Sequence, residues 1–309
     1  MNILKNRYFY FALSLLIIIP GLTILVSQIA RKEVPLSIDF TGGSLLEVRF
    51  DTGEPAPAEI IAVYDTLGVK DAQVQTTDKG TIIIRSSYVD NDLRDDVLTA
   101  LETEFAANVE VVQLESVGPS IGKQVTSRAG IAIGFAALAV VIYITIVFRK
   151  MEHAFRYGVC AIIAMIHDVA VVFSVAAIGS IFFGWEMDAL FLTALLTVIG
   201  FSVQDKIVVF DRIRENSGIL RRLNFETLVN HSIIQTLQRS INTQLMTVEF
   251  LLLALALIGG VTLREFAIIL LVGLLSGTYS SIFIAAPILV LWENKEWRTW
   301  FRRKENTTA

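Results

Sequence analysis

Cysteine, histidine and charged residues are scarce in this 309-residue chain, which has one cysteine, three histidines and 18% charged residues. The single Cys160 lies in an apolar run and cannot form an internal disulfide, which excludes a disulfide-stapled scaffold. So few histidines and cysteines also leave little material for a metal site. A soluble protein carries about 25% charged residues, whereas 54% of this chain is hydrophobic. These proportions favour a membrane protein.

Signatures of enzymes and of nucleic-acid binding are missing as well. The sequence has no HExxH zinc sequence, no GxxxxGK[ST] phosphate-binding loop and no convincing nucleophile elbow. It offers no basic patch for nucleic acid. We therefore predict a protein that is not an enzyme, uses no cofactor or metal and binds no nucleic acid.

Long hydrophobic runs dominate what is present. A bilayer-spanning helix needs about 20 mainly apolar residues. Six stretches qualify, at approximately 8–29, 129–148, 155–179, 187–210, 241–258 and 266–292. A cleaved signal peptide is the alternative for the first, but its apolar run is long and no small-x-small cleavage site follows. The pattern predicts a polytopic α-helical protein with six transmembrane helices in contact with membrane lipid, the first an uncleaved anchor.

Basic residues gather at alternate ends of these stretches. They are Lys5, Arg7, Arg149, Lys150, Arg156, Arg212, Arg214, Arg221, Arg222, Lys295, Arg298, Arg302, Arg303 and Lys304. Lysine and arginine favour the cytoplasmic side of a membrane, so both termini are predicted to be cytoplasmic. The predicted organisation is 1–29 for the N-terminus and first helix, 30–125 for an extracytoplasmic domain, 126–292 for helices two to six, and 293–309 for a basic cytoplasmic tail.

The segment 30–125 has the composition and pattern of a folded domain. It carries 8 basic and 17 acidic residues, whereas the rest of the chain carries 18 basic and 13 acidic. Alternation and helical periodicity predict a strand, a helix, two strands, a helix and a strand, at 44–50, 56–67, 72–76, 81–85, 90–105 and 109–114. This β-α-β-β-α-β order is the ferredoxin-like arrangement of an α+β domain. The fold is a common one and alone says little about function.

Two glycine-containing segments connect this domain to the neighbouring helices. Glycine permits positive φ and close backbone approach. A tight turn is the simpler interpretation of the first segment and a rigid hinge that of the second, and both could serve as joints if the domain moves. The candidate hinge residues are Asp39, Gly42, Gly43, Gly118 and Pro119.

Charged residues inside the apolar stretches are the candidate functional groups. Asp205 lies six residues before Asp211, about 9 Å further into the membrane at 1.5 Å per residue. An ionisable group at such depth is expensive and suggests a functional site; a carboxylate at headgroup level is the alternative. Asp168 and His167 lie near the middle of the third stretch and could relay protons or form a structural hydrogen bond. Arg239, at the predicted start of the fifth helix, could supply a cation.

Four segments of the sequence resemble the SecF family of bacterial and archaeal protein export. They are D-F-T-G-G within 38–50, V-G-P-S-I-G-K at 117–123, the fourth-helix segment 200–216 and the sixth-helix segment 277–285. Four long motifs in the right order are specific, and the plan of one helix, an outer domain and five helices agrees. The resemblance covers nearly the whole chain.

The resemblance implies a function in preprotein export. Family members pair with SecD, in a unit related to resistance-nodulation-division transporters, and assist the SecYEG channel. Their outer domains are thought to hold the unfolded preprotein, and proton passage through the membrane part resets them. The implied proton-pathway residues are Asp205, Arg239 and Asp168. A membrane scaffold that moves no protons is the competing interpretation. A drug or lipid pump is disfavoured, because those proteins carry both halves in one long chain.

Two positions depart from the family pattern in ways that bear on proton passage. Lys206 stands where threonine or serine is usual, and Glu249 where an apolar residue is usual. We predict that Glu249 is a mid-membrane carboxylate at the depth of His167 and Asp168. Lys206 is expected either to tune Asp205 through its positive charge or simply to reach the cytoplasmic interface.

Overall fold

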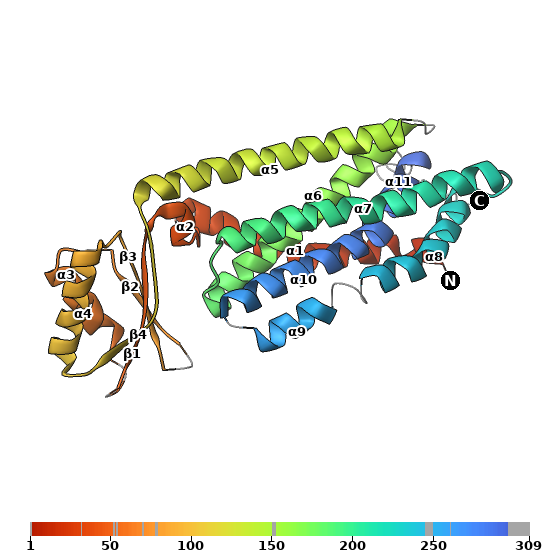
Figure 1. The fold of residues 1–309 in the computed structure, drawn as a ribbon. Coiled ribbons are helices and arrows are strands. Elements are labelled where there is room, and N and C mark those ends of the chain that lie inside the picture. Colours follow the sequence, from red (N-terminus) through yellow and green to blue (C-terminus); the bar gives the residue numbers. More distant parts are fainter. Residues whose placement is uncertain are drawn as a thin grey trace, which may run out of the picture. The chain divides into compact units, whose positions relative to one another are not determined.

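The computed structural model describes residues 2–31, 33–51, 53, 55–69, 71–77, 80–149, 153–244, 250–259 and 261–295. Its contacts divide the chain into two compact units (Figure 1). The helical unit comprises Met1–Pro35 and Ala132–Ala309, and the α/β unit comprises Leu36–Ile131.

The α/β unit contains a four-stranded sheet with helices packed on it. Its elements are α2 (Ile38–Thr41), β1 (Gly43–Phe50), α3 (Pro57–Thr66), β2 (Gln73–Thr76), β3 (Ile82–Ser86), α4 (Asn91–Phe105) and β4 (Val109–Val117), followed by the start of α5 (Pro119–Phe148). The strands are antiparallel to their neighbours in the order β2-β3-β1-β4. The predicted β-α-β-β-α-β order is confirmed, as is an antiparallel α+β domain early in the chain.

Local sequence accounts for these elements. Along β1, Leu46, Val48 and Phe50 alternate toward a core shared with α3 and α4. The Asp90 carboxylate accepts a hydrogen bond from the Leu93 amide at 2.9 Å and so caps α4. Tyr64 of α3 is only 2% exposed, and this burial raises the pKa of its hydroxyl, which keeps the core uncharged.

The two predicted hinge segments pack on one another inside the α/β unit. Gly42 and Gly43 have φ of +74° and +137°, values that favour glycine. A Cβ atom on Gly122 would lie 2.5 Å from the Gly42 nitrogen, and one on Gly42 would lie 2.8 Å from Pro119 Cα. Both segments lie within the α/β unit, residues 36–131. The role of these residues as joints stays a prediction, whereas their close packing is a feature of the fold.

This packing predicts that alanine substitution has different effects on stability at Gly122, within α5, and at Gly118, directly before α5. We expect Gly122→Ala to destabilise the protein by about 1–3 kcal/mol, because the new methyl group meets backbone that has no alternative rotamer. Gly118→Ala is the matched control, since a Cβ at Gly118 meets nothing within 4 Å. Thermal unfolding of both variants measures the effect. Equal melting temperatures would show that the Gly42–Gly122 contact is loose.

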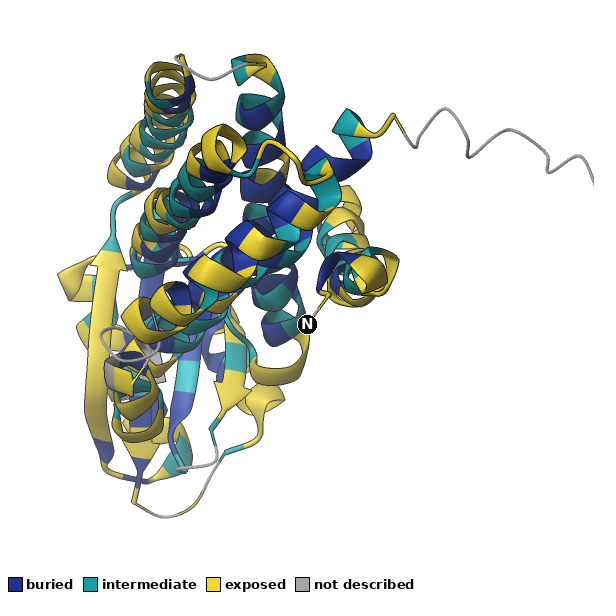
Figure 2. Ribbon diagram, turned by 90° about the vertical axis from the view of Figure 1, so that its right-hand side faces the viewer, coloured by how far each residue is buried: buried dark blue, intermediate teal, exposed yellow. Residues whose placement is uncertain are grey.

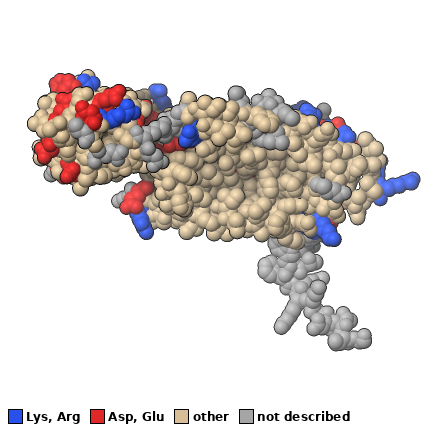
Figure 3. Space-filling model, turned by 90° about the horizontal axis from the view of Figure 1, so that it is seen from below, with Lys and Arg blue, Asp and Glu red and all other residues tan. Residues whose placement is uncertain are grey.

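Among the residues that the structure describes, the helical unit contains η1 (Leu4–Asn6), α1 (Arg7–Arg31), the later part of α5, and seven further elements. These are α6 (Ala154–Phe183), α7 (Ala189–Ile219), α8 (Phe225–Gln244), α9 (Phe250–Ile258), α10 (Val261–Ser280), the π-helical turn η3 (Ser281–Ala285) and α11 (Ala286–Glu293). Figure 3 shows a broad surface almost free of charged side chains on this unit, while acidic residues gather on the α/β unit. The composition suits a unit that faces lipid.

Five helices of the described residues are long and apolar enough to cross a membrane. They are Leu4–Arg31, Pro119–Phe148, Ala154–Phe183, Ala189–Ile219 and Leu263–Glu293. The predicted fifth stretch, 241–258, contains residues 245–249, which lie outside the described residues, so the count of six stays a prediction. The last span is one continuous path through α10, η3 and α11.

The core of the helical unit lies where α6, α7 and α10 pack together (Figure 2). Small residues bring these helices close. A Cβ on Gly273 of α10 would lie 2.3 Å from Val198 Cγ2 of α7, and one on Gly277 would lie 3.3 Å from Ser202 Cα. Such small-residue contacts are typical of helices that associate within membranes. They bring the polar face of α10 against α6 and α7.

Candidate functional site

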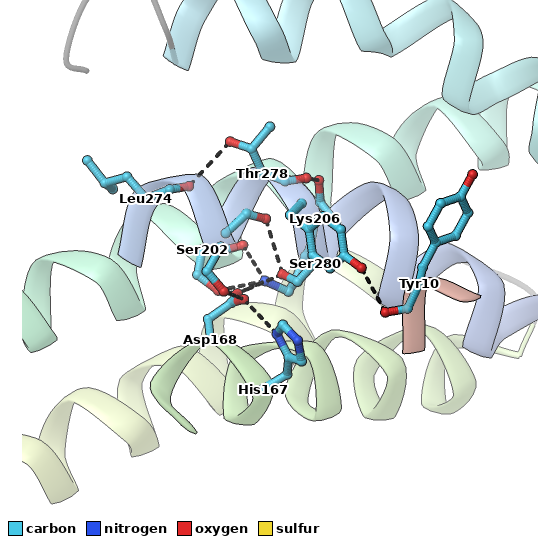
Figure 4. A network of polar contacts seen from close by, with 12 residues as sticks. Tyr10, His167, Asp168, Ser202, Lys206, Leu274, Thr278 and Ser280 are labelled. Carbon is cyan, nitrogen blue, oxygen red and sulfur yellow. Dashed lines mark hydrogen bonds and ion pairs between the residues drawn. The ribbon is translucent and has the colours of Figure 1, made fainter. Parts of the chain in front are cut away.

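Asp168 is the centre of a buried polar cluster near the middle of α6 (Figure 4). Its side chain is fully buried. The Oδ2 atom accepts hydrogen bonds from Ser202 Oγ at 2.6 Å, Lys206 Nζ at 2.7 Å and Ser280 Oγ at 2.7 Å. The Oδ1 atom accepts one from Ser276 Oγ at 2.7 Å and lies 3.1 Å from His167 Nδ1. A single carboxylate thereby links three helices.

Lys206 of α7 provides the positive charge of this cluster. Its side chain is 0% exposed. Besides Asp168, its ammonium group donates to the Ser202 carbonyl at 2.9 Å and to Ser202 Oγ at 2.6 Å. The alternative that Lys206 reaches an aqueous interface is wrong. Helical side chains lean toward the N-terminus of their own helix, and here that direction leads back to Ser202 and the interior.

The serines of α10 reach Asp168 because of their spacing. Ser276 and Ser280 are four residues apart, so they share one face of the helix. The close approach at Gly277 places that face against Ser202 of α7. The π-helical turn η3 begins directly after Ser280, and such turns occur frequently at functional sites. The segment 276–280 therefore carries two of the hydroxyl groups that donate to Asp168, and Ser202 of α7 carries a third.

Asp205 lies beside the cluster but has a different partner. Its Oδ2 accepts a hydrogen bond from Thr278 Oγ1 at 3.0 Å, and its residue is half-buried. Thr278 lies between Ser276 and Ser280 on α10. Two carboxylates from α6 and α7 are thus held by one short segment of α10, with Lys206 next to Asp205 in sequence and bonded to Asp168.

Arg239 is not brought to Asp205 in this structure. It does not open a helix: α8 begins at Phe225, behind Asn224, whose side chain accepts a hydrogen bond from the Thr227 amide at 2.8 Å. Arg239 lies in the later part of α8 and is exposed. Among the described residues, none of the hydrogen bonds or ion pairs joins its side chain to Asp205.

The sequence prediction did not include the start of α8 at Phe225, because one face of this helix is polar and lowers its mean hydropathy. Hydropathy alone places a helix at 241–258, whereas the amphipathic segment 225–244 buries Leu228, Val229 and Ile233 against the core. The asparagine at position 224 was the available sequence signal for this earlier start. Glu249, predicted to lie near His167 and Asp168, falls outside the described residues.

An aromatic contact connects the cluster to the first helix. The His167 ring stacks on the Tyr279 ring, with centroids 6.3 Å apart and planes inclined by 22°. The Tyr279 hydroxyl donates to the Tyr10 carbonyl of α1 at 2.8 Å. These contacts place His167, which is hydrogen-bonded to Asp168, between the polar cluster and α1 (Figure 4).

Comparison with known proteins identifies the family. The C-terminal family model described as "Protein export membrane protein SecD/SecF, C-terminal" matches residues 97–295, and the "SecD/SecF GG Motif" matches residues 29–54. A protein translocase subunit SecF from Anaerolinea thermophila is 64% identical and covers 98% of this chain and 97% of its own. The chain belongs to the SecD/SecF family. It is a SecF-type subunit of a protein translocase, a multi-pass membrane protein and a transport component rather than an enzyme.

Further relatives support the same family assignment. SecF from Thermobaculum terrenum is 46% identical over 100% of this chain and 99% of its own. The crystal structure of SecDF from Thermus thermophilus superposes with a TM-score of 0.79 at 31% identity, covering 95% of this chain. This SecF-type chain spans only 39% of that SecDF chain. The fold of this chain therefore recurs within that longer SecDF protein.

The Asp168–Lys206 pair is the main feature that sequence reasoning missed. Both residues were singled out, but Lys206 was considered only with Asp205, Glu249 and the interface. Asp168 and Lys206 lie at similar distances from the connection between their helices. Asp168 is 15 residues before Phe183, where α6 ends, and Lys206 is 17 residues after Ala189, where α7 begins. Similar depth and opposite charge were the signal from which the pair could have been predicted.

Proposed function

We propose that this SecF-type subunit acts with SecD and uses the proton-motive force to promote late export of preproteins through SecYEG. The observation that carries the proposal is the buried cluster of Asp168, Lys206 and the adjacent Asp205 on three packed helices. Charged residues at the centre of a membrane helix are unfavourable by about 2.5–3.5 kcal/mol each and mark ion or proton pathways. Asp205, Asp168 and Arg239 are the proposed proton-pathway residues.

Energy considerations support coupling to the membrane potential. One charge that crosses 100 mV gains or loses about 2.3 kcal/mol. That free energy changes a two-state equilibrium by roughly fifty-fold. A carboxylate that accepts and releases a proton beside Lys206 would change the hydrogen bonds that join α7 to α10. The helices of the cluster would then respond to proton passage.

The topology we propose places both termini in the cytoplasm and the α/β unit outside the membrane. The ferredoxin-like element order and acidic composition of 30–125 suit an extracytoplasmic domain. A non-conducting scaffold that stabilises SecD and the channel is the second candidate function. It is favoured only if the buried charges serve packing alone.

Preprotein translocation in vesicles, with and without a proton gradient, distinguishes these candidates. Asp205→Asn and Arg239→Met are each expected to abolish the stimulation by the gradient while the complex still assembles. Asp211→Asn is the matched control, because Asp211 lies six residues further along α7, is half exposed and is paired with Arg214 at 2.7 Å. It should keep full stimulation. If the protein is a non-conducting scaffold, all three variants should keep the stimulation by the proton gradient.

Strand β4 is the proposed contact for the unfolded preprotein. It lies at one edge of the sheet, and Val111, Val112 and Leu114 are each about 40% exposed. An apolar edge strand can pair with an extended peptide by strand addition. The opposite edge, β2 (Gln73–Thr76), has three polar residues out of four.

A photo-crosslinker on each edge tests this contact during export. At Val112 we expect several-fold more crosslinking to a translocating preprotein than at Gln75, which is the matched polar position on β2. The yield of the crosslinked product on a gel measures the difference. Equal yields at both positions would contradict preprotein binding at β4.

A further inference from the structure

The ammonium group of Lys206 lies in a pocket of oxygen atoms. Three of them are within hydrogen-bond distance: Asp168 Oδ2 at 2.7 Å, the Ser202 carbonyl at 2.9 Å and Ser202 Oγ at 2.6 Å. Carboxylate, carbonyl and hydroxyl oxygens are the ligands that hard metal cations prefer. Discontinuous helices of membrane transporters coordinate Na⁺ with such groups. The set of atoms around Lys206 is therefore one that a monovalent cation would use.

We propose that the Lys206 ammonium is a tethered cation that occupies this oxygen site and thereby excludes Na⁺ from it. The inference rests on the proposed function and specifies its coupling ion: a chain with lysine here works with protons and is indifferent to sodium. Lys206 is a specificity-determining residue, because it decides which cation the Asp168 cluster holds. A chain without the ammonium group is expected to bind Na⁺ at Asp168.

Charge balance supports this assignment. The Asp168 carboxylate is fully buried and needs a positive partner. Among the described residues, Lys206 is the lysine or arginine that pairs with it. A sodium ion beside the ammonium would place two positive charges within a few ångströms of each other in a region of low dielectric, which is strongly unfavourable. Only one cation can be held there.

The surrounding hydroxyl groups also support the proposal that these oxygen atoms form a cation site. Ser276 and Ser280 donate to Asp168 at 2.7 Å, one to each carboxylate oxygen. Their hydroxyl oxygens keep lone pairs that can accept from or coordinate a cation. The site would therefore retain oxygen ligands on α6, α7 and α10 after the lysine side chain is removed.

Sodium-dependent thermal stability of the purified protein tests the inference directly. The variants are Lys206→Ala and Lys206→Ser, which open the space, and Lys206→Met, which removes the same charge but fills it. Melting temperatures are compared in NaCl and in choline chloride at equal ionic strength. We expect Na⁺ to raise the melting temperature of the alanine and serine variants by on the order of 5 °C at saturation. The native chain and Lys206→Met should show no sodium-specific shift.

The double variant Asp168→Asn with Lys206→Ala completes the test, since it removes the proposed carboxylate ligand and should lose the sodium shift. A sodium shift that is absent from both Lys206→Ala and Lys206→Ser, while the variants fold, would overturn the inference. So would an equal shift in the native chain. Neither result depends on export, whereas failure of the proposed function would appear as native export that ignores the proton gradient.

Discussion

Lys206→Met is expected to destabilise the protein by about 3–5 kcal/mol, the usual effect of removing one partner of a buried ion pair. Methionine has nearly the same length as lysine, so packing around α7 changes little. What is lost is the only positive charge among the described residues that pairs with Asp168 at 2.7 Å. The carboxylate then stays buried beside His167 and three serine hydroxyl groups, and those hydroxyl groups supply no charge to replace the ammonium.

The double variant Asp168→Asn with Lys206→Met should recover most of that loss, because both charges are removed together. Thermal or denaturant unfolding in one detergent measures all four corners of the cycle. Lys123→Met, at an exposed position, controls for the general effect of exchanging lysine for methionine. If the double variant is as unstable as the two single variants added together, Asp168 and Lys206 do not interact.

Gly273→Val is expected to have an effect of about 3 kcal/mol or more, because the extra atoms have no space between α10 and α7. A Cβ on Gly273 would lie 2.3 Å from Val198 Cγ2 and 3.1 Å from Val172 Cγ2. Both valines are buried and branched at Cβ, so neither can rotate away easily. The helices would have to separate, which also draws Ser276 and Ser280 away from Asp168.

Gly200→Val is the matched control on α7, since a Cβ at Gly200 meets nothing within 4 Å. We expect it to change the melting temperature by no more than about 2 °C. If Gly273→Val melted at the same temperature as Gly200→Val, the contact between α10 and α7 would be adjustable. The loss in Gly273→Val should extend to gradient-stimulated export, because the cluster depends on that contact.

The elements of the α/β unit were predictable from local pattern. Leu46, Val48 and Phe50 alternate along β1, and Val97 and Leu101 repeat along α4 at helical spacing. Such periodicities are set by the geometry of one element and need no knowledge of its neighbours. The antiparallel pairing of β2 with β3 follows from the short connection between them. The pairing of β1 with β3 and with β4 joins strands that are distant in sequence, and local pattern does not determine it.

The contacts of the polar cluster were less predictable, because they depend on the rotation of helices about their axes. Sequence places Asp168 and Lys206 within their helices, but which face meets α10 is decided by Gly273 and Gly277. The lean of Lys206 toward Ser202 follows from helix geometry and was open to prediction. The exposure of Arg239 could not be predicted from the sequence, because it depends on how α8 packs.

The Asp168–Lys206 pair also bears on how the chain enters the bilayer during synthesis. Helices α6 and α7 follow one another through the short connection Gly184–Asp188, and the two members of the ion pair, Asp168 and Lys206, each lie near the middle of their helix. Inserted singly, each helix would expose that charge to lipid, at about 2.5–3.5 kcal/mol. Inserted as a hairpin, the two charges neutralise each other before α10 arrives with its serines. The ion pair thus makes the two helices a natural unit of membrane integration, with α10 added afterwards.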